Sequence, residues 1–162
     1  MASLVMASHA NLGIPTDHGG RGRKERTVKN ILCVGLDAAL DTAYARLLTA
    51  SGYRAITASV DQITSAPMPY ALSVDAVIVE CRESSMDKLD RLWNLRKTVP
   101  RVPILMIADC MSVEFYIRAC TLGIHDYLCR PVSDRDVMKS IQAILHGDDT
   151  GGCRWLGRGS FR

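Results

Sequence analysis

Between residues 30 and 146 the chain alternates short apolar runs with longer amphipathic segments. The apolar runs are rich in β-branched residues and predict strands at 30–35, 53–57, 75–81, 103–108 and 125–129. Between them, apolar residues at helical spacing predict helices at 38–51, 60–66, 86–99, 113–123 and 134–145. This alternation predicts an α/β fold: a doubly wound, five-stranded parallel sheet covered by helices on both faces.

Polar residues and glycines mark the expected ends of these helices. Asp37, Ser112 and Ser133 stand at N-cap positions, where a side-chain oxygen can accept a hydrogen bond from a free backbone amide. Gly52 and Gly123 stand where two helices end. On the helix at 86–99, the pattern predicts an inner face made of Met86, Leu89, Leu92, Trp93 and Val99.

Both ends of the chain lack this alternation. Residues 1–29 are rich in glycine and contain the basic cluster RGRKER at 21–26, and residues 147–162 carry apolar side chains without an obvious core. We therefore divide the chain into a flexible basic arm at 1–29, a folded domain at 30–146 and a flexible tail at 147–162. The net charge of +3 comes from the ends, since the domain itself is close to neutral.

The composition narrows the class of protein. The six cysteines form no C-x-x-C pair and share no ligand spacing with the four histidines, so we expect core cysteines and no metal or other cofactor. No apolar run is long enough for a membrane helix. The first residues lack the basic segment of a secretory signal. The sequence therefore predicts a cytoplasmic protein.

The carboxyl ends of the strands are where a doubly wound sheet forms its functional crevice. One of these positions is unusual, because Glu80 places a charge at the end of an apolar run, which costs free energy unless the charge is paired. The residues at the strand ends are Gly35, Leu36, Asp37, Glu80, Ala108, Asp109 and Arg130.

Four stretches, GYRAITAS, DAVIVE, RVPILMIA and LGIHDYLCRPVSDRDV, carry a resemblance to a known family. Over residues 30–146 the sequence resembles the receiver domains of bacterial response regulators, of the chemotaxis-regulator type. The resemblance implies a flavodoxin-like (βα)5 fold with strand order 2-1-3-4-5 and a place in two-component or phosphorelay signalling. It also implies a cis peptide bond between Arg130 and Pro131.

The resemblance shows which functional parts have changed. A working receiver accepts a phosphoryl group on an aspartate after its third strand, next to an acidic pair that holds Mg²⁺, a hydroxyl and a lysine. Here Gly35 and Leu36 replace the acidic pair, Glu80 stands at the acceptor position, Ala108 at the hydroxyl position and Arg130 at the lysine position. The resemblance therefore implies a degenerate receiver, or pseudo-receiver, that has lost the ordinary phosphotransfer route.

Glu80 and Arg130 are of opposite charge, and a guanidinium fork suits bidentate pairing with a carboxylate. We expect a permanent ion pair between them in place of a phosphorylation-dependent contact; the alternative is that Glu80 simply meets water. Asp37 is either a helix cap or a leftover metal ligand. Asp109 either shares Arg130 or caps the turn into the next helix.

Tyr127 matches the aromatic residue that swings inward when a receiver is activated. Because Ala108 leaves space and provides no hydroxyl, Tyr127 is either held in one position or is an ordinary half-buried tyrosine.

The leading hypothesis is a phosphorylation-independent binding module without catalytic turnover, so not an enzyme. Its partner is then a histidine kinase, a separate output protein, or a second copy in a homodimer, since a short tail cannot form an output domain. The expected contact surface comprises the helix at 113–123, the strand at 125–129 and the helix at 134–145. Candidate contact residues are Phe115, Tyr116, Arg118, Met138 and Ile141, of which Phe115 and Ile141 can instead belong to the core.

Three alternatives are weighed against this hypothesis. In the first, a receiver is phosphorylated at a non-standard acid, Asp37 or Asp109. In the second, the chain is a small enzyme or a ligand-binding flavodoxin-like protein, which is disfavoured because VGLDAAL at 34–40 is no glycine-rich phosphate cradle. The third is nucleic-acid binding through RGRKER, which is disfavoured because the arm lacks interleaved aromatic residues.

Overall fold

The computed structural model describes residues 27–36, 43–65, 74–82, 85–109, 112–147 and 154–155. The strands are β1 (Asn30–Gly35), β2 (Arg54–Ser59), β3 (Ala76–Cys81), β4 (Ile104–Ala108), β5 (Asp126–Cys129) and β6 (Arg154–Trp155). The helices are α1 (Ala43–Ala50), α2 (Val60–Ser65), α3 (Met86–Thr98), α4 (Val113–Thr121) and α5 (Asp134–His146). Within this part of the chain no helix is long and apolar enough to cross a membrane.

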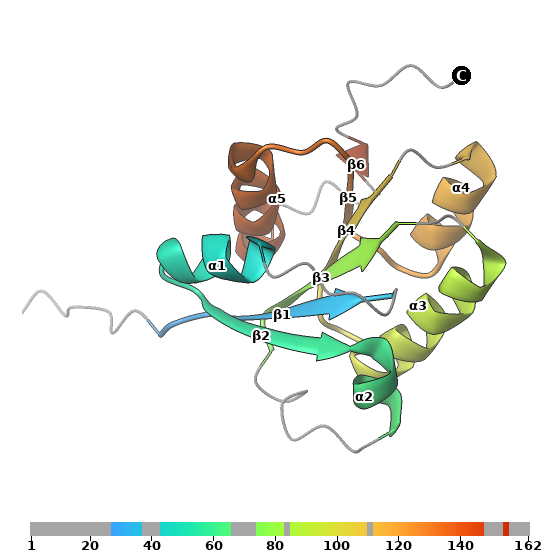
Figure 1. Ribbon diagram of the computed structural model, residues 1–162, viewed down its shortest axis with the longest axis horizontal. Helices are drawn as coiled ribbons and strands as arrows, with labels where there is room; N and C mark the ends of the chain where they lie inside the picture. Colours follow the sequence, from blue (N-terminus) through green and yellow to red (C-terminus); the bar gives the residue numbers. More distant parts are fainter. Residues whose placement is uncertain are drawn as a thin grey trace, which may run out of the picture.

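The strands form one parallel sheet in the order β2-β1-β3-β4-β5-β6 (Figure 1). The predicted doubly wound, flavodoxin-like fold and its order 2-1-3-4-5 are thereby confirmed. A sixth strand, which the sequence did not predict, lies within the segment interpreted as a flexible tail and extends the sheet beyond β5. The peptide bond between Arg130 and Pro131 is cis, as the resemblance implied.

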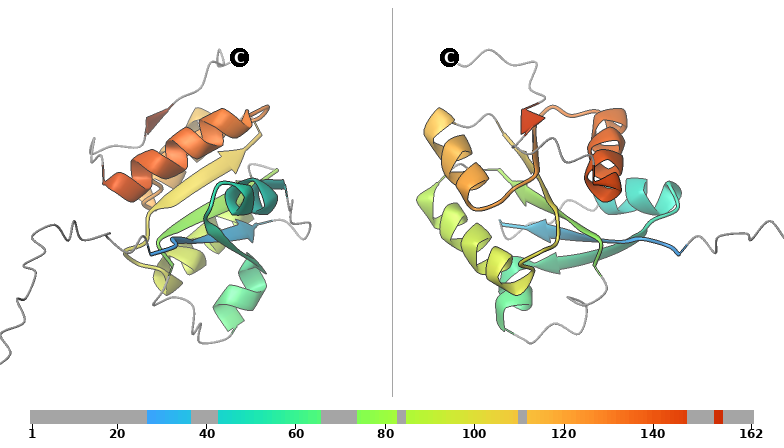
Figure 2. Two further views of the ribbon diagram at one scale, coloured as in Figure 1. Left: turned by 90° about the vertical axis from the view of Figure 1, so that its left-hand side faces the viewer. Right: turned by 180° about the vertical axis from the view of Figure 1, so that it is seen from behind.

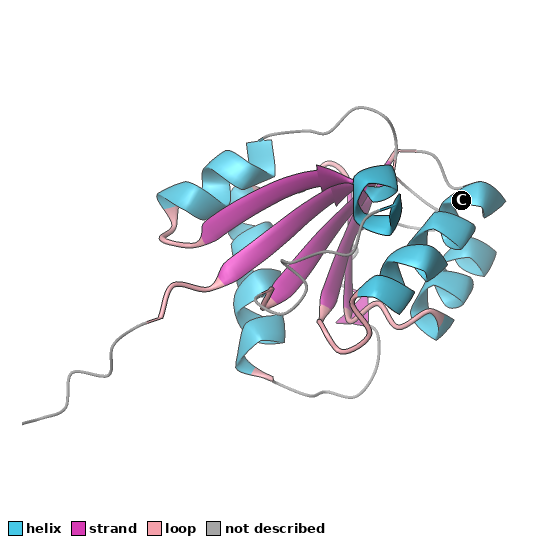
Figure 3. Ribbon diagram, turned by 90° about the horizontal axis from the view of Figure 1, so that it is seen from below, coloured by secondary structure: helices cyan, strands magenta, loops and turns pink. Residues whose placement is uncertain are grey.

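Helices cover both faces of the sheet, with α1 and α5 on one side and α2, α3 and α4 on the other (Figures 2 and 3). Successive side chains of a strand point to opposite faces, so β1 contributes to two cores. Ile31 and Cys33 pack in the core beneath α1 and α5, whereas Leu32 and Val34 pack in the core beneath α2, α3 and α4. Burial of β1, β3 and β4 on both faces explains why these strands read as continuous apolar runs.

The helix ends agree with the sequence where they are described. The hydroxyl of Ser112 accepts a hydrogen bond from the amide of Phe115, and that of Ser133 accepts one from the amide of Asp136. The proposed cap Asp37 lies outside the described residues.

The predicted inner face of α3 is only partly right. Leu89 and Leu92 are buried, but Met86 is 55% exposed and Trp93 is 47% exposed. Leu95 takes the expected inward place. Trp93 lies on the outer side of the helix, where the Lys97 ammonium sits 5.0 Å from the centre of its ring.

Arg96 holds together the loops at the amino-terminal end of β4 and β5. Its guanidinium donates hydrogen bonds to the carbonyls of Val99 at 3.1 Å, Val102 at 2.8 Å and Leu122 at 3.3 Å, and also to the carbonyl of Gly123. Burial lowers the pKa of Arg96, and the carbonyl oxygens compensate its buried charge. Gly123 has a φ of +87°, a left-handed conformation that ends α4. Its lack of a side chain leaves room for the Arg96 guanidinium.

A matched pair of glycines tests this arrangement. A Cβ on Gly123 would lie 3.3 Å from Nε of Arg96, whereas Gly52, with a φ of +85°, has nothing within 4 Å of an added Cβ. We expect Gly52→Ala to lower the free energy of unfolding by about 1 kcal/mol through left-handed strain alone. Gly123→Ala should lower it by about 1–3 kcal/mol more, because Arg96 must leave carbonyls to which it is bonded. Urea unfolding measures both, and equal effects of the two substitutions would contradict a fixed Arg96.

Candidate functional site

Glu80 is a buried carboxylate on the next-to-last residue of β3, and 5% of its side chain is exposed. The register places it between Gly35 of β1 and Ile107 of β4, near the carboxyl ends of three adjacent strands. Its carbonyl accepts a hydrogen bond of 2.9 Å from the amide of Leu36, which fixes the backbone there. A carboxylate this deeply buried requires a compensating positive charge.

Arg130, directly after β5, supplies that charge. Its Nη2 lies 3.0 Å from Oε2 of Glu80, so the expected ion pair is present and Glu80 does not simply meet water. Its Nη1 lies 3.4 Å from Oδ1 of Asp109 and 3.4 Å from the carbonyl oxygen of Cys81. The guanidinium fork of Arg130 is therefore shared between Glu80 and Asp109. Of the two roles considered for Asp109, sharing Arg130 is the one observed.

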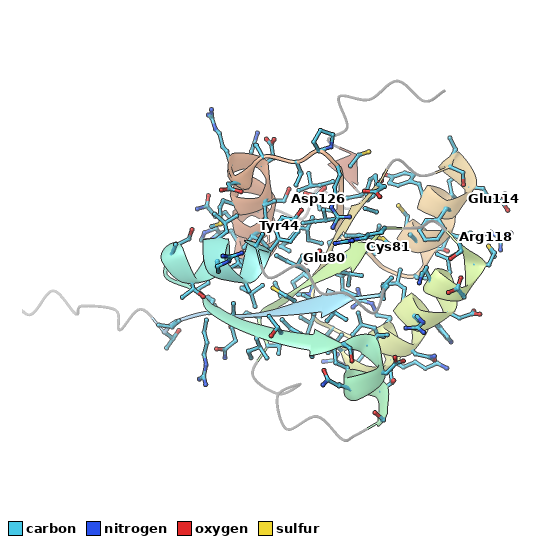
Figure 4. The ribbon with its side chains drawn as sticks, viewed as in Figure 1. Tyr44, Glu80, Cys81, Glu114, Arg118 and Asp126 are labelled. Atoms are coloured by element: carbon cyan, nitrogen blue, oxygen red, sulfur yellow. The ribbon has the colours of Figure 1, made fainter. Side chains whose placement is uncertain are left out.

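Tyr44 completes the surroundings of Arg130. It comes from α1 (Figure 4), one of the two helices on the side of the sheet that carries Glu80. Its phenol is a hydrogen-bond partner of the Arg130 guanidinium. Burial acts to lower the pKa of Arg130, but Tyr44, Glu80 and Asp109 outweigh it, so the pKa lies above its usual value. The sequence analysis did not connect Tyr44 with this site.

The electrostatic influence of Glu80 reaches Cys33 in the middle of β1. Burial, and secondarily the negative charge of Glu80, raise the pKa of the Cys33 thiol from 9.0 to about 12. Cys33 is therefore protonated and unreactive at neutral pH, which agrees with its predicted place in the core.

The end of β1 does not fit a magnesium ion. Magnesium takes oxygen ligands, usually carboxylates and water, but Gly35 has no side chain and Leu36 is a fully buried hydrocarbon. The carbonyl of Leu36 instead accepts a hydrogen bond of 3.2 Å from Arg91 of α3. In the described part of the chain no three His, Cys, Asp or Glu residues are grouped so that they could hold a metal ion. Asp37, the other candidate acid, lies outside that part.

Tyr127 points into the molecule on the opposite face of the sheet. Its ring is buried in the core that also contains Ala108, and its hydroxyl donates a hydrogen bond of 3.2 Å to the carbonyl of Asp109. The ring centre lies 5.6 Å from that of Tyr116 on α4. Tyr127 is thus tied to the residue that shares Arg130, and it is not an ordinary half-buried tyrosine.

The candidate contact residues differ in their exposure. Phe115 is buried beneath α4, which corrects its assignment to an interaction face, and Ile141 is likewise a core residue. Tyr116 and Met138 are partly buried against the two cores. Arg118 is exposed and lies 2.8 Å from Glu114, one helical turn earlier (Figure 4).

Two exposed apolar residues of α4 were missed by the sequence analysis. Val113 is 48% exposed and Ile117 is 55% exposed. Their spacing of four residues places them on one stripe, facing away from the buried Phe115 and Ala119. That spacing could have been recognised in the sequence.

Comparison with known proteins supports one family. No protein-family model matches the sequence. The transcriptional regulatory protein QseB of Escherichia coli O157:H7 is 30% identical over 76 residues, which are 47% of this chain and 35% of that protein. The transcriptional regulatory protein CpxR of Klebsiella pneumoniae is 28% identical over 118 residues, 73% of this chain and 50% of that protein. The chain thus spans half or less of the length of these curated relatives.

Solved structures share the fold at lower sequence identity. A putative pilus assembly-related protein of Burkholderia pseudomallei K96243 matches with a TM-score of 0.63 and 20% identity, covering 80% of this chain and 95% of that one. A response regulator receiver domain protein (CheY-like) of Methanospirillum hungatei JF-1 matches with a TM-score of 0.61 and 20% identity. The match covers 78% of this chain and 100% of that one. The chain is thus similar in sequence to response regulators and shares the fold of their receiver (CheY-like) domains.

Proposed function

We propose that this chain is a phosphorylation-independent receiver, a pseudo-receiver that acts by protein–protein interaction in a two-component or phosphorelay pathway and catalyses no reaction. In this proposal the ion pair between Glu80 and Arg130 is present at all times, and it takes the place of the contact that a phosphoryl group would otherwise create. Because a carboxylate bears less charge and fewer acceptor oxygens than a phosphoryl group, the replacement is partial.

One observation carries this proposal: the Glu80 carboxylate is buried and already paired, at 3.0 Å, with Arg130. A phosphoryl donor would have to reach a side chain of which 5% is exposed, next to a cation that is engaged. Gly35, the last residue of β1, and Leu36 after it offer no oxygen ligand from their side chains for the metal that assists such a transfer.

Asp109 is the described residue that best supports the alternative of a non-standard acceptor. Its side chain is 54% exposed and lies within reach of Arg130. Its position at the rim makes it chemically accessible, but the nearby positions where a receiver carries its acidic pair are apolar. We therefore rank phosphorylation at Asp109 second.

The proposed output surface is formed by α4, β5 and α5, and the partner is a histidine kinase or a separate output protein. Val113 and Ile117 give α4 an exposed apolar stripe, next to the exposed ion pair of Arg118 and Glu114. We place the protein in the cytoplasm, because Cys33 and Cys120 are free thiols, as expected in a reducing compartment.

Incubation with a small phosphodonor and Mg²⁺, followed by intact mass spectrometry, tests the loss of phosphotransfer. We expect no phosphorylated species, while a receiver that retains the acidic pair, treated in parallel, becomes labelled. Asp109→Asn and Asp37→Asn are the matched controls for the second-ranked route. Labelling that disappears in either variant would replace our proposal with phosphorylation at that acid, and labelling lost in Glu80→Gln would overturn it outright.

Cys33 reports whether Glu80 carries its charge. Its folded pKa of about 12 exceeds the ordinary value of 9.0, so its stability contribution is complete below pH 9 and is lost as pH rises toward 12. The expected slope in that window is about 1.4 kcal/mol per pH unit. Removing the charge with Glu80→Gln should lower the pKa of Cys33 without restoring 9.0, because burial is the larger cause.

The thiolate absorbance of the protein, measured as a difference against Cys33→Ser, gives this pKa. Asp109→Asn is the control, since Asp109 is not a cause of the shift. An unchanged pKa of Cys33 in Glu80→Gln would mean that Glu80 is not a charged partner of Arg130.

A further inference from the structure

The amino-terminal end of β4 carries a backbone amide whose acceptor is a side chain. Ile104, the first residue of β4, is fully buried, so its amide needs an acceptor within the protein. Nδ1 of His125 provides that acceptor, 3.2 Å from the Ile104 nitrogen. The contact runs in both directions, because the His125 amide donates a hydrogen bond of 2.8 Å to the Ile104 carbonyl. A single residue, directly before β5, therefore holds both backbone groups of Ile104.

This contact is possible in one protonation state of His125. A neutral imidazole has one bare nitrogen, which accepts a hydrogen bond, and one nitrogen that carries a hydrogen. Because Nδ1 accepts from Ile104, the hydrogen of the neutral ring is on Nε2. Protonation places a hydrogen on Nδ1 as well, so two donors face each other and the buried amide loses its acceptor. His125 is exposed, so a proton from solution reaches the ring without any opening of the fold.

The charged groups around His125 carry both signs. The guanidinium of Arg96 in α3 donates hydrogen bonds to the carbonyls of Leu122 and Gly123, which lead into His125. Asp126 follows His125, but its carboxylate is buried and accepts a hydrogen bond from the next amide of its own strand. Other charged residues on the elements that meet here are Glu114 and Arg118 of α4, which pair with each other, Lys97 of α3, Arg101 before β4, Asp75 before β3, and Arg154 of β6. The hydrogen bond from Ile104, and not one dominant charge, therefore decides which form of the ring the fold holds.

We propose that His125 is a proton-sensitive clasp between β4 and the connection from α4 to β5. At neutral pH the imidazole closes the start of β4 onto the residues that precede β5. Below about pH 6.5, where an imidazole ordinarily takes up a proton, the Nδ1 contact is lost and this end of the two strands opens. The clasp lies at the end of the sheet opposite to the Glu80–Arg130 ion pair, so it is independent of the function proposed for that pair.

The clasp gives stability a definite dependence on pH. The unfolded chain binds a proton at His125 below about pH 6.5, whereas the closed clasp requires the neutral ring. Because the unfolded state then binds more protons, the contribution of the clasp is present above about pH 6.5 and is lost as the pH falls. His146 at the end of α5 is an exposed histidine outside the clasp and serves as the matched control.

Nuclear magnetic resonance of the full chain tests the clasp. A heteronuclear spectrum of the imidazole rings at neutral pH identifies which nitrogen carries the hydrogen. Amide hydrogen exchange, corrected for the intrinsic effect of pH, gives the protection of Ile104 at about pH 7.5 and about pH 5, on either side of the ordinary imidazole titration. His125→Asn places an amide oxygen, which does not titrate, near the position of Nδ1. His125→Phe keeps a ring without an acceptor, and His146→Asn is the control.

We expect the neutral ring of His125 to carry its hydrogen on Nε2. In the unsubstituted chain and in His146→Asn, protection of the Ile104 amide should fall about tenfold between the two pH values, while the amides of β1 keep theirs. His125→Asn should keep Ile104 protected at both pH values, and in His125→Phe that protection should be low at both.

A neutral His125 ring with its hydrogen on Nδ1 would overturn the proposal, and this test needs no substitution. An Ile104 amide equally protected at both pH values in the unsubstituted chain would do the same. So would a tenfold fall that persists in His125→Asn, or a loss of protection shared equally by β1, which would mean that acid loosens the whole sheet.

Discussion

The ion pair between Glu80 and Arg130 is the interaction on which the functional end of this sheet depends. Glu80 stands on a strand buried on both faces, where water cannot solvate its carboxylate. Arg130 reaches it from the other side of β4, so the pair ties the ends of β3 and β5 together. Such a pair gives little net stability compared with a well-packed apolar substitute, but breaking it leaves an uncompensated buried charge. The geometry of this site therefore requires both partners.

From this pair a connected set of contacts extends to both faces. Asp109 shares the guanidinium on one face, and its carbonyl accepts the hydrogen bond of Tyr127, whose ring lies in the core of the other face. Tyr127 in turn contacts Tyr116 of α4. The Glu80–Arg130 ion pair and the surface of α4 are thus linked through Asp109 and Tyr127. A fixed ion pair at one end is expected to hold α4 in one arrangement, as our proposal of a permanently set receiver requires.

The sequence predicted the backbone better than the details of side chains. Alternating apolar and amphipathic segments define a doubly wound sheet because burial on both faces requires continuous apolar strands. Periodicity was weaker evidence on α3, where Met86 and Trp93 are apolar yet exposed; a helix flank can carry a large apolar residue without reaching the core. The sharing of Arg130 with Asp109 could not be read from the sequence, because it depends on the relative positions of β4 and β5. Neither could β6, since two residues have no periodicity.

A double-mutant cycle measured by urea unfolding tests the central claim most directly, with Glu80→Gln, Arg130→Ala and the two combined. We predict that Arg130→Ala lowers the free energy of unfolding by about 3–5 kcal/mol, because it strands a buried carboxylate. Glu80→Gln should lower the free energy of unfolding less, since Arg130 keeps its contacts with the Asp109 carboxylate and the carbonyl of Cys81. The coupling energy should be about 1–3 kcal/mol, and additive effects within about 0.5 kcal/mol would contradict a pocket built on this ion pair.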